Sequence, residues 1–184
     1  MQLSETEALF LGGRAGSGKT SVGAEIHLRL ATAGIRHGLI EGDNLDQAYP
    51  PPWEHGLAER NLAAIWANYR DLGYRRLIYT NTASVFADVA AALTAAMGDA
   101  PRLTAVLLTC SDETAAQRLS RREIGSGLGD HLDRSGAMAR RLAREAPGWV
   151  HRVDTDGRDV GEIAGEIIEL AGWIPAKSTP GPDR

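Results

Sequence analysis

The distribution of apolar residues divides the chain into short apolar runs and longer amphipathic segments. The runs predict strands at 7–12, 35–41, 76–80, 103–109 and 149–153. Between and after them, apolar residues recur every third or fourth position and predict helices at 20–33, 55–72, 85–97, 112–122, 131–145 and 160–170. Strands that are apolar at nearly every position and alternate with helices are typical of a parallel sheet covered on both faces. We therefore expect an α/β fold, a three-layer α/β/α sandwich with a five-stranded parallel sheet.

A glycine-rich stretch follows the first predicted strand. It reads Gly13-Arg14-Ala15-Gly16-Ser17-Gly18-Lys19-Thr20 and fits G-x-x-x-x-G-K-[ST]. Glycines let successive backbone N–H groups face one anion, and the N-terminus of the next helix adds positive charge. We expect Lys19 to reach the β- and γ-phosphates and Thr20 to hold Mg²⁺. The stretch predicts a P-loop NTPase fold in which residues 13–20 bind ATP or GTP.

Polar residues follow three other predicted strands. Gly42-Asp43-Asn44 comes after the second strand, Asn81 after the third, and residues 109–112 end the fourth. In a doubly wound sheet, ligands bind outside the carboxyl ends of the strands. We therefore expect these residues and the glycine-rich loop to line one crevice.

Some motifs that would indicate other nucleotide-binding proteins are missing from the sequence. The chain lacks the Asn-Lys-x-Asp of a GTPase, and Asp154-Thr155-Asp156-Gly157 follows the last strand, where no γ-phosphate switch can form. The third strand ends in Asn81 rather than in the Walker-B acid of large ATPases. Small kinases, whose lid closes over the nucleotide, remain.

Arginines gather where such a lid is expected. Arg118, Arg121 and Arg122 end the helix after the fourth strand, a glycine-containing loop follows, and Arg134 lies in the next helix. Lid arginines neutralise the transferring phosphoryl group while water is excluded. We predict a short lid at about 122–134, with Arg118 and Arg122 among the nucleotide-binding residues. Solvation of exposed helix faces is the alternative role for these arginines.

Asp43 is the candidate carboxylate on the acceptor side. At the end of the second strand it can accept the proton of an acceptor hydroxyl, or hold Mg²⁺ through water. Capping of a following helix is a third role. The sequence alone does not decide whether Asp43 is a base, a metal ligand or a helix cap.

The order of motifs over residues 7–172 resembles the small P-loop kinases of the nucleoside monophosphate kinase-like superfamily. Adenylylsulfate kinase, gluconate kinase and chloramphenicol phosphotransferase are the nearest relatives that this resemblance suggests. It implies that Asp43 faces the acceptor, that Arg118 lies under the adenine or the phosphates, and that Arg134 reaches the phosphates from the lid. It also implies that Asp156-Gly157-Arg158 borders the adenine. The predicted catalytic residues are thus Lys19, Asp43 and Arg134.

The acceptor is expected among residues 49–55, 61–69 and 81–86. Amide groups there can bind a sugar or polyol, and aromatic rings can offer an apolar face. Trp66 and Tyr69 are more typical of core packing, and Phe86 fits either role. The positive charge of Arg60 could bind an anionic acceptor, so such an acceptor remains an alternative. The predicted substrate-binding residues are Asp43, Asn44, Trp53, Arg60, Asn61 and Asn81.

Composition limits partners and location. The formal net charge of −4 is not the excess of positive charge that favours binding to nucleic acid or to an anionic membrane. No stretch reaches the roughly 18 apolar residues of a membrane helix. Cys110 is the single cysteine, so a reducing cytoplasm is the expected location. We expect one kinase domain at 1–174, a monomer or homodimer, and a flexible tail at 175–184.

Two functions fit these features. The first is an ATP-dependent phosphotransferase that moves the γ-phosphoryl group to a hydroxyl of a small molecule, with Mg²⁺. Adenylylsulfate kinase and nucleoside monophosphate kinase are alternatives to this function. The second is a nucleotide-binding switch or slow regulatory ATPase, which the missing Walker-B acid permits. A kinase forms ADP only with an acceptor, whereas a switch hydrolyses ATP slowly without one.

Overall fold

The structure is a computed structural model that describes residues 5–121 and 128–174. Its centre is a five-stranded sheet in the order β2-β3-β1-β4-β5, in which all neighbours are parallel. The predicted parallel sheet is thus confirmed. The strands are β1 (Glu7–Gly12), β2 (Gly38–Glu41), β3 (Arg76–Thr80), β4 (Arg102–Thr109) and β5 (His151–Asp154).

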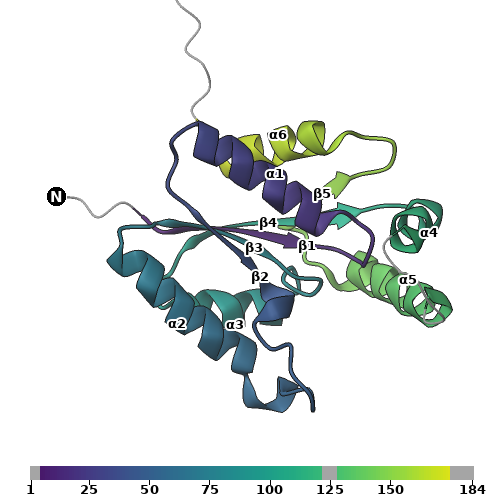
Figure 1. Ribbon diagram of the computed structural model, residues 1–184, viewed down its shortest axis with the longest axis horizontal. Helices are drawn as coiled ribbons and strands as arrows, with labels where there is room; N and C mark the ends of the chain where they lie inside the picture. Colours follow the sequence, from purple (N-terminus) through teal and green to yellow (C-terminus); the bar gives the residue numbers. More distant parts are fainter. Residues whose placement is uncertain (1–4, 122–127, 175–184) are drawn as a thin grey trace, which may run out of the picture.

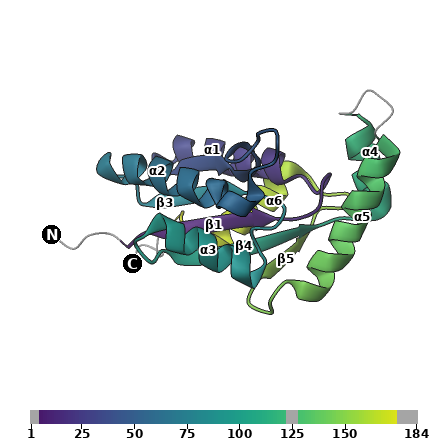
Figure 2. The same cartoon turned by 90° about the horizontal axis from the view of Figure 1, so that it is seen from below.

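Helices cover both faces of this sheet, which confirms the three-layer α/β/α sandwich. On one face lie α1 (Lys19–Thr32) and α6 (Val160–Ala171), and on the other α2 (Leu57–Asp71) and α3 (Ala87–Met97) (Figure 1). Two further helices, α4 (Asp112–Ser120) and α5 (Leu128–Glu145), connect β4 to β5 along the chain. They lie toward the carboxyl ends of the strands (Figure 2). The 3₁₀ turns η1 (Gly42–Asn44) and η2 (Trp53–His55) lie between β2 and α2.

Hydrophobic clusters hold the layers together on the two faces of the sheet. Successive side chains of a strand point to opposite faces, so β1 contributes to both clusters. Leu9 and Leu11 pack toward α1 and α6, whereas Ala8 and Phe10 pack toward α2 and α3. The second cluster also includes Leu142 and Ala146 of α5. The C-terminal half of α5 is therefore anchored in the core, while its N-terminal half borders the carboxyl edge of the sheet (Figure 2).

Several boundaries and core assignments differ from expectation. β2 begins at Gly38 rather than at residue 35, and β5 begins at His151, which leaves Trp149 outside the strand and 51% exposed. The apolar periodicity of the last helix predicts that Val160 and Leu170 face the core, but each is 37% exposed. Val160 is the first residue of α6 and lines a cavity, and Leu170 lies beside the buried stripe of the helix. That stripe consists of Ile163, Ala164, Ile167, Ile168 and Ala171.

A buried carboxylate ties the amino-terminal edge of the sheet together. Glu7 of β1 is 9% exposed and forms ion pairs with Arg76 of β3 and Arg102 of β4. Its Oε2 also accepts a hydrogen bond of 3.1 Å from Trp173 Nε1, beyond the end of α6. A buried charge is stable only when it is paired and hydrogen-bonded, so three strands and the end of α6 must assemble together around it.

None of the described helices is long and apolar enough to cross a membrane.

A histidine pair connects α1 with the segment before β2. His27 Nδ1 and His37 Nε2 are 2.8 Å apart, and His37 Nδ1 lies 2.7 Å from the carbonyl oxygen of Ile35. Because a carbonyl only accepts, His37 donates from Nδ1 and its Nε2 accepts from His27. Burial is the largest effect on the pKa of His37 and lowers it; His27 and Arg76 lower it further, against the opposing effect of the Ile35 bond. His37 is therefore neutral in the folded chain at neutral pH.

We predict that the protein loses stability as the pH falls below about 6.5, the pKa of histidine in an unfolded chain. Below that value the unfolded chain binds more protons than the folded one, so the free energy of unfolding decreases as the pH falls. His37 can contribute at most about 1.4 kcal/mol per pH unit. Urea unfolding at several pH values measures this slope. His37→Asn should flatten it, and the exposed His151→Asn should not; equal slopes in all three proteins would contradict the prediction.

Candidate active site

The loop between β1 and α1 turns tightly at the carboxyl edge of the sheet. Gly13, Gly16 and Gly18 have φ values of 145°, 85° and 97°, a region that residues with side chains rarely adopt. A Cβ on Gly13 would lie 2.6 Å from the carbonyl oxygen of Leu108 in β4. The loop therefore passes so close to β4 that this position requires glycine. The strand, loop and helix follow one another as the motif predicts.

The inner side of the loop fits an anion. Ser17 Oγ is buried and has no hydrogen-bond partner among the described residues, although buried polar atoms normally have one. Lys19 Nζ donates to the carbonyl oxygens of Gly13 and Arg14, at 2.8 and 3.1 Å, so its ammonium group lies against the loop. The N-terminus of α1 adds unpaired N–H groups at the same place. These are the groups that a chain of phosphates requires.

A hydroxyl and a carboxylate meet beside this loop. Thr20 Oγ1 at the start of α1 donates to Glu41 Oε2 at the end of β2, over 3.2 Å. Mg²⁺ prefers such oxygen donors, keeps several waters, and uses one or two carboxylates plus substrate phosphates. The donor set therefore fits Mg²⁺. Sequence reasoning named Thr20 and Asp43 for the metal and missed Glu41, whose signal was its place as the last residue of β2.

Asp43 is oriented by the neighbouring strand. Parallel pairing sets Glu41 of β2 opposite Thr80 of β3, so the residues after the two strands lie close together. Asn81 Nδ2 donates to Asp43 Oδ1 over 2.7 Å, and Asn81 Oδ1 accepts from the N–H of Ala83 over 2.9 Å. The carboxylate is exposed, and its hydrogen bond goes to Asn81 rather than to the backbone of a following helix. This arrangement favours a chemical role over helix capping.

Arg118 joins the P-loop to the turn after β5. Its Nη1 donates to the carbonyl oxygen of Gly16 at 3.2 Å and to Thr155 Oγ1 at 2.9 Å, and its Nη2 donates to the carbonyl oxygen of Thr155 at 2.9 Å. Beside it is a cavity of about 250 Å³ between α1, α4 and the start of α6. The residues of this cavity that were predicted to bind the nucleotide are Gly16, Ser17, Gly18, Arg118 and Arg158. Thr155, Arg121 and Val160 also line it and were not predicted to do so.

The other residues of the turn after β5 contact the protein itself. The carboxylate of Asp156 accepts a hydrogen bond of 2.9 Å from the N–H of Ser111, before α4. Gly157 has φ 63°, in the left-handed region. Arg158 pairs with Glu166 at 2.7 Å while also lining the cavity. A contact of Asp156 and Gly157 with the nucleotide remains a prediction.

The side chain of Arg14 connects the P-loop to α4 and α5. It is 4% exposed, donates from Nε to Ser135 Oγ at 2.9 Å and pairs with Asp112. Ser135 Oγ in turn donates to the carbonyl oxygen of Ala15 at 2.9 Å. Only the backbone of Arg14 is thus left for phosphate binding. Sequence reasoning did not find Ser135, because nothing in the pattern distinguishes a serine in an amphipathic helix.

The predicted lid is only partly described. Arg122 and the rest of 122–127 lie outside the described residues, and α5 begins at Leu128, inside the predicted lid. Arg134 is exposed on α5 and is the neighbour of Ser135, which touches the P-loop. Arg134 therefore lies on the helix that borders the loop, and its contact with phosphates remains a prediction.

Residues predicted for the acceptor have different surroundings. Asn44 lies in η1 beside Asp43, and Trp53 begins η2. Asn61 Nδ2 donates to the carbonyl oxygen of Leu45 over 2.5 Å and so holds α2 against the segment after η1. Arg60 is exposed on α2. The aromatic residues Trp66 and Phe86 are buried in the core cluster, and Tyr69 packs against it, which agrees with the core interpretation of Trp66 and Tyr69.

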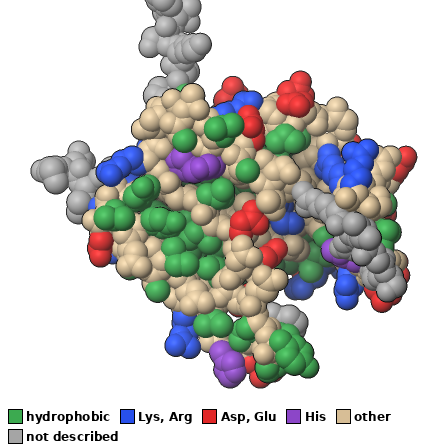
Figure 3. Space-filling view, viewed as in Figure 1, with side chains coloured by type: hydrophobic (Ala, Val, Ile, Leu, Met, Phe, Trp, Pro, Cys, Tyr) green, Lys and Arg blue, Asp and Glu red, His purple; other side chains and the backbone are tan. Residues whose placement is uncertain are grey.

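The two sides of the site differ in charge. Glu41 and Asp43 lie on the β2 side, and Tyr79 lies beneath them: burial, followed by the charges of Asp43, Glu59 and Asp46, raises its pKa. Arginines of α4 and α5 lie on the other side. Figure 3 shows acidic side chains near the middle of this face and basic ones toward the α4 and α5 end.

Comparison with known proteins identifies the fold. No protein-family model and no curated protein sequence matches the chain. Among solved structures, the tunicamycin resistance protein of Deinococcus radiodurans superposes with a TM-score of 0.65 at 19% identity, over 92% of this chain and 97% of that one. A gluconokinase from Sinorhizobium meliloti gives 0.59 at 21% identity, over 90% and 91%. The chain has the fold of the small P-loop kinases.

The APS kinase of Mycobacterium tuberculosis, solved with AMPPNP and APS, shares this small P-loop kinase fold. It superposes with a TM-score of 0.54 at 21% identity, over 90% of this chain and 97% of that one. The fold predicted from the order of motifs is thereby confirmed. At such identities a superposition establishes the fold and leaves the acceptor to be argued from this chain's own residues.

We predict that Glu41→Gln weakens the Mg²⁺ dependence of nucleotide binding. The amide keeps the shape of the side chain but loses the charge that attracts the metal and its waters. The Mg²⁺ concentration that half-saturates ADP binding should rise about tenfold, with ADP affinity in EDTA unchanged. Isothermal titration calorimetry measures both. Glu169→Gln, at an exposed position of α6, is the control, and an equal loss of ADP affinity with and without Mg²⁺ would assign Glu41 a purely structural role.

Proposed function

We propose that the protein is an ATP-dependent phosphotransferase that moves the γ-phosphoryl group to a hydroxyl of a small molecule. The observation that carries this proposal is the carboxylate of Asp43, which Asn81 holds at 2.7 Å at the same sheet edge as the P-loop. Phosphate-binding loops occur in many NTPases. An exposed, oriented carboxylate next to one is what the transfer to an alcohol needs, because it can accept the hydroxyl proton.

Each charged group then has a role. Lys19 and the N–H groups of the loop bind the β- and γ-phosphates, and Thr20 with Glu41 holds Mg²⁺. Bound Mg²⁺ neutralises charge on these phosphates. Arg118 holds the loop in its phosphate-binding shape through its bonds to Gly16 and Thr155, and Arg134 approaches the phosphates from the lid. Asp43 orients the acceptor hydroxyl and takes its proton.

The cavity beside Arg118 supports binding of the nucleoside end of ATP. It adjoins Gly16 and Gly18 of the loop, and its apolar wall is formed by Val22, Val160 and Ile163. A base can pack against this wall while Arg158 lies at its rim. This also accounts for the exposure of Val160, whose side chain borders the cavity rather than the core.

The charge near Asp43 favours a neutral, polyhydroxylated acceptor such as a sugar, polyol or nucleoside. Glu41, Asp46 and Glu59 lie on the same side, and no ion pair of these carboxylates with Lys or Arg occurs within residues 5–121 and 128–174. Adenylylsulfate or a nucleoside monophosphate would meet like charges there, which cost several kcal/mol when close. Arg60 is the nearest residue in sequence to Glu59 that could offset this repulsion.

A nucleotide-operated switch is the competing function, and one observation favours it. Asn81 directly follows the end of β3, where a vigorous ATPase carries an acid. The two functions separate in one assay. ADP formation should depend on an acceptor found by a thermal-shift screen of sugars, nucleosides and aminoglycosides with ADP and Mg²⁺. Slow ADP formation that no such compound accelerates would favour the switch.

We predict that Asp43→Asn lowers kcat with that acceptor by at least about 10²-fold, the usual contribution of a general base. The amide can still hydrogen-bond Asn81, so ADP affinity should stay within about twofold. Coupled assays and calorimetry give the two values. Asp71→Asn, an exposed change at the end of α2, should leave both unchanged. Parallel losses of turnover and ADP binding in Asp43→Asn would contradict a role on the acceptor side.

A further inference from the structure

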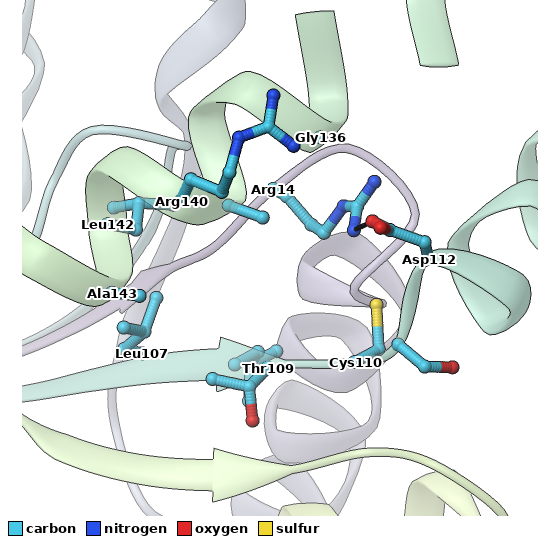
Figure 4. Close-up of a pocket in the computed structure, with 12 residues that line it drawn as sticks. Arg14, Leu107, Thr109, Cys110, Asp112, Gly136, Arg140, Leu142 and Ala143 are labelled. Atoms are coloured by element: carbon cyan, nitrogen blue, oxygen red, sulfur yellow. Dashed lines mark hydrogen bonds and ion pairs between the residues drawn. The ribbon is translucent and has the colours of Figure 1, made fainter. Parts of the chain in front are cut away.

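A second cavity, of about 360 Å³, lies between the carboxyl end of β4 and α5. Its lining includes Arg14 of the P-loop but none of the residues that line the cavity beside Arg118, and neither Asp43 nor Asn81. Leu107 and Thr109 of β4 and Leu142 and Ala143 of α5 are among the lining residues, and in Figure 4 Leu107 lies beside Ala143. The cavity is therefore separate from the proposed reaction site.

Small residues on one face of α5 create this space. Gly136, Ala139 and Ala143 lie three and four positions apart, so they line the same side of the helix. Their short side chains leave space between α5 and the end of β4, next to Leu107 and Leu142, which are each 2% exposed. The volume falls in the range of small-molecule pockets, which are mostly apolar with a few polar groups.

One end of the cavity carries an unbalanced positive charge. The guanidinium groups of Arg14 and Arg140 both lie there, and Asp112 pairs with Arg14 (Figure 4). The hydrogen bond and charge of Arg14, with a smaller effect of Arg140, lower the pKa of Asp112 despite desolvation, so this carboxylate is ionised at neutral pH. Arg140 is exposed and forms no ion pair with any other residue in the described part of the chain. Among the lining residues of this cavity, two cations therefore face one anion, and Asp133 lies with the same three side chains at an adjoining pocket.

We propose that this cavity is a binding site for a small carboxylic acid with an apolar body, either aromatic or branched aliphatic. The body packs between Leu107 and Ala139, and the carboxylate pairs with Arg140. Arginine suits this role because its planar fork matches a carboxylate with two hydrogen bonds. The apolar walls distinguish this site from the P-loop, whose groups recognise phosphates.

Fluorine NMR on the full chain tests the proposal with 4-(trifluoromethyl)benzoate as the probe. The probe should show saturable binding that persists with saturating ADP and Mg²⁺, because the two cavities share no lining residue. The neutral 4-(trifluoromethyl)benzamide should bind at least about tenfold more weakly, since it cannot form a charge-assisted pair. Displacement of the benzoate by ADP, equal affinity of the amide, or no binding of the benzoate would each overturn the proposal.

Two variants locate the bound probe. Arg140→Gln should weaken benzoate binding about tenfold through loss of the charge, and Ala139→Leu should abolish it by filling the cavity. Arg144→Gln is the matched control, because Arg144 lies on the same helix, is 68% exposed and pairs only weakly with Glu145 at 3.8 Å. Circular dichroism checks folding; if Ala139→Leu does not fold, Arg140→Gln decides. Unchanged affinity in Arg140→Gln would refute the site. These readouts need no turnover and do not depend on the proposed kinase activity.

Discussion

The whole site depends on the close passage of the β1–α1 loop over β4. Gly13 lies so near the carbonyl oxygen of Leu108 that no side chain fits there, and the positive φ values at Gly16 and Gly18 turn the backbone inward. Because the loop is pressed onto the sheet, its N–H groups and the start of α1 point to one place. The parallel sheet then brings the ends of β2 and β3 beside that place, which makes Glu41, Asp43 and Asn81 available to a common ligand.

Arginine side chains serve two different purposes around this loop. Arg14 and Arg118 form hydrogen bonds that hold the loop from opposite sides, one toward Ser135 of α5 and one toward Thr155 after β5. Such charge-assisted bonds to carbonyl and hydroxyl oxygens position the backbone and leave less of the guanidinium group for a ligand. Arg134 and Arg140, by contrast, are exposed on α5. A count of basic residues near a P-loop therefore overestimates how many can touch phosphate.

The site separates charges in a way that suits phosphoryl transfer. Figure 3 shows acidic side chains near the middle of this face and basic ones toward the α4 and α5 end, where Asp112 and Asp156 also lie. Donor phosphates are attracted to the basic side, while an alcohol needs an acceptor for its proton on the other. The same separation selects against anionic acceptors, so the electrostatic layout constrains both substrates of the proposed reaction.

The sequence by itself determined the fold class, the succession of strands and helices along the chain, and the P-loop. Each rests on local signals: apolar runs of strand length, helical periodicity and the four fixed positions of the motif in residues 13–20. Local signals also placed Asp43 and Asn81 at strand ends, and β3 pairing with β2 is what makes them neighbours.

Only the tertiary structure decided which side chain each polar group meets. Glu41 reaches Thr20 across 21 positions of sequence, and Arg14 reaches Ser135 across 121. The exposure of Val160 and the cavity under α5 likewise follow from how helices pack on the sheet. The physical reason is range: backbone propensity and periodicity act over a few residues, whereas hydrogen bonds and burial between distant segments exist only once the chain has folded.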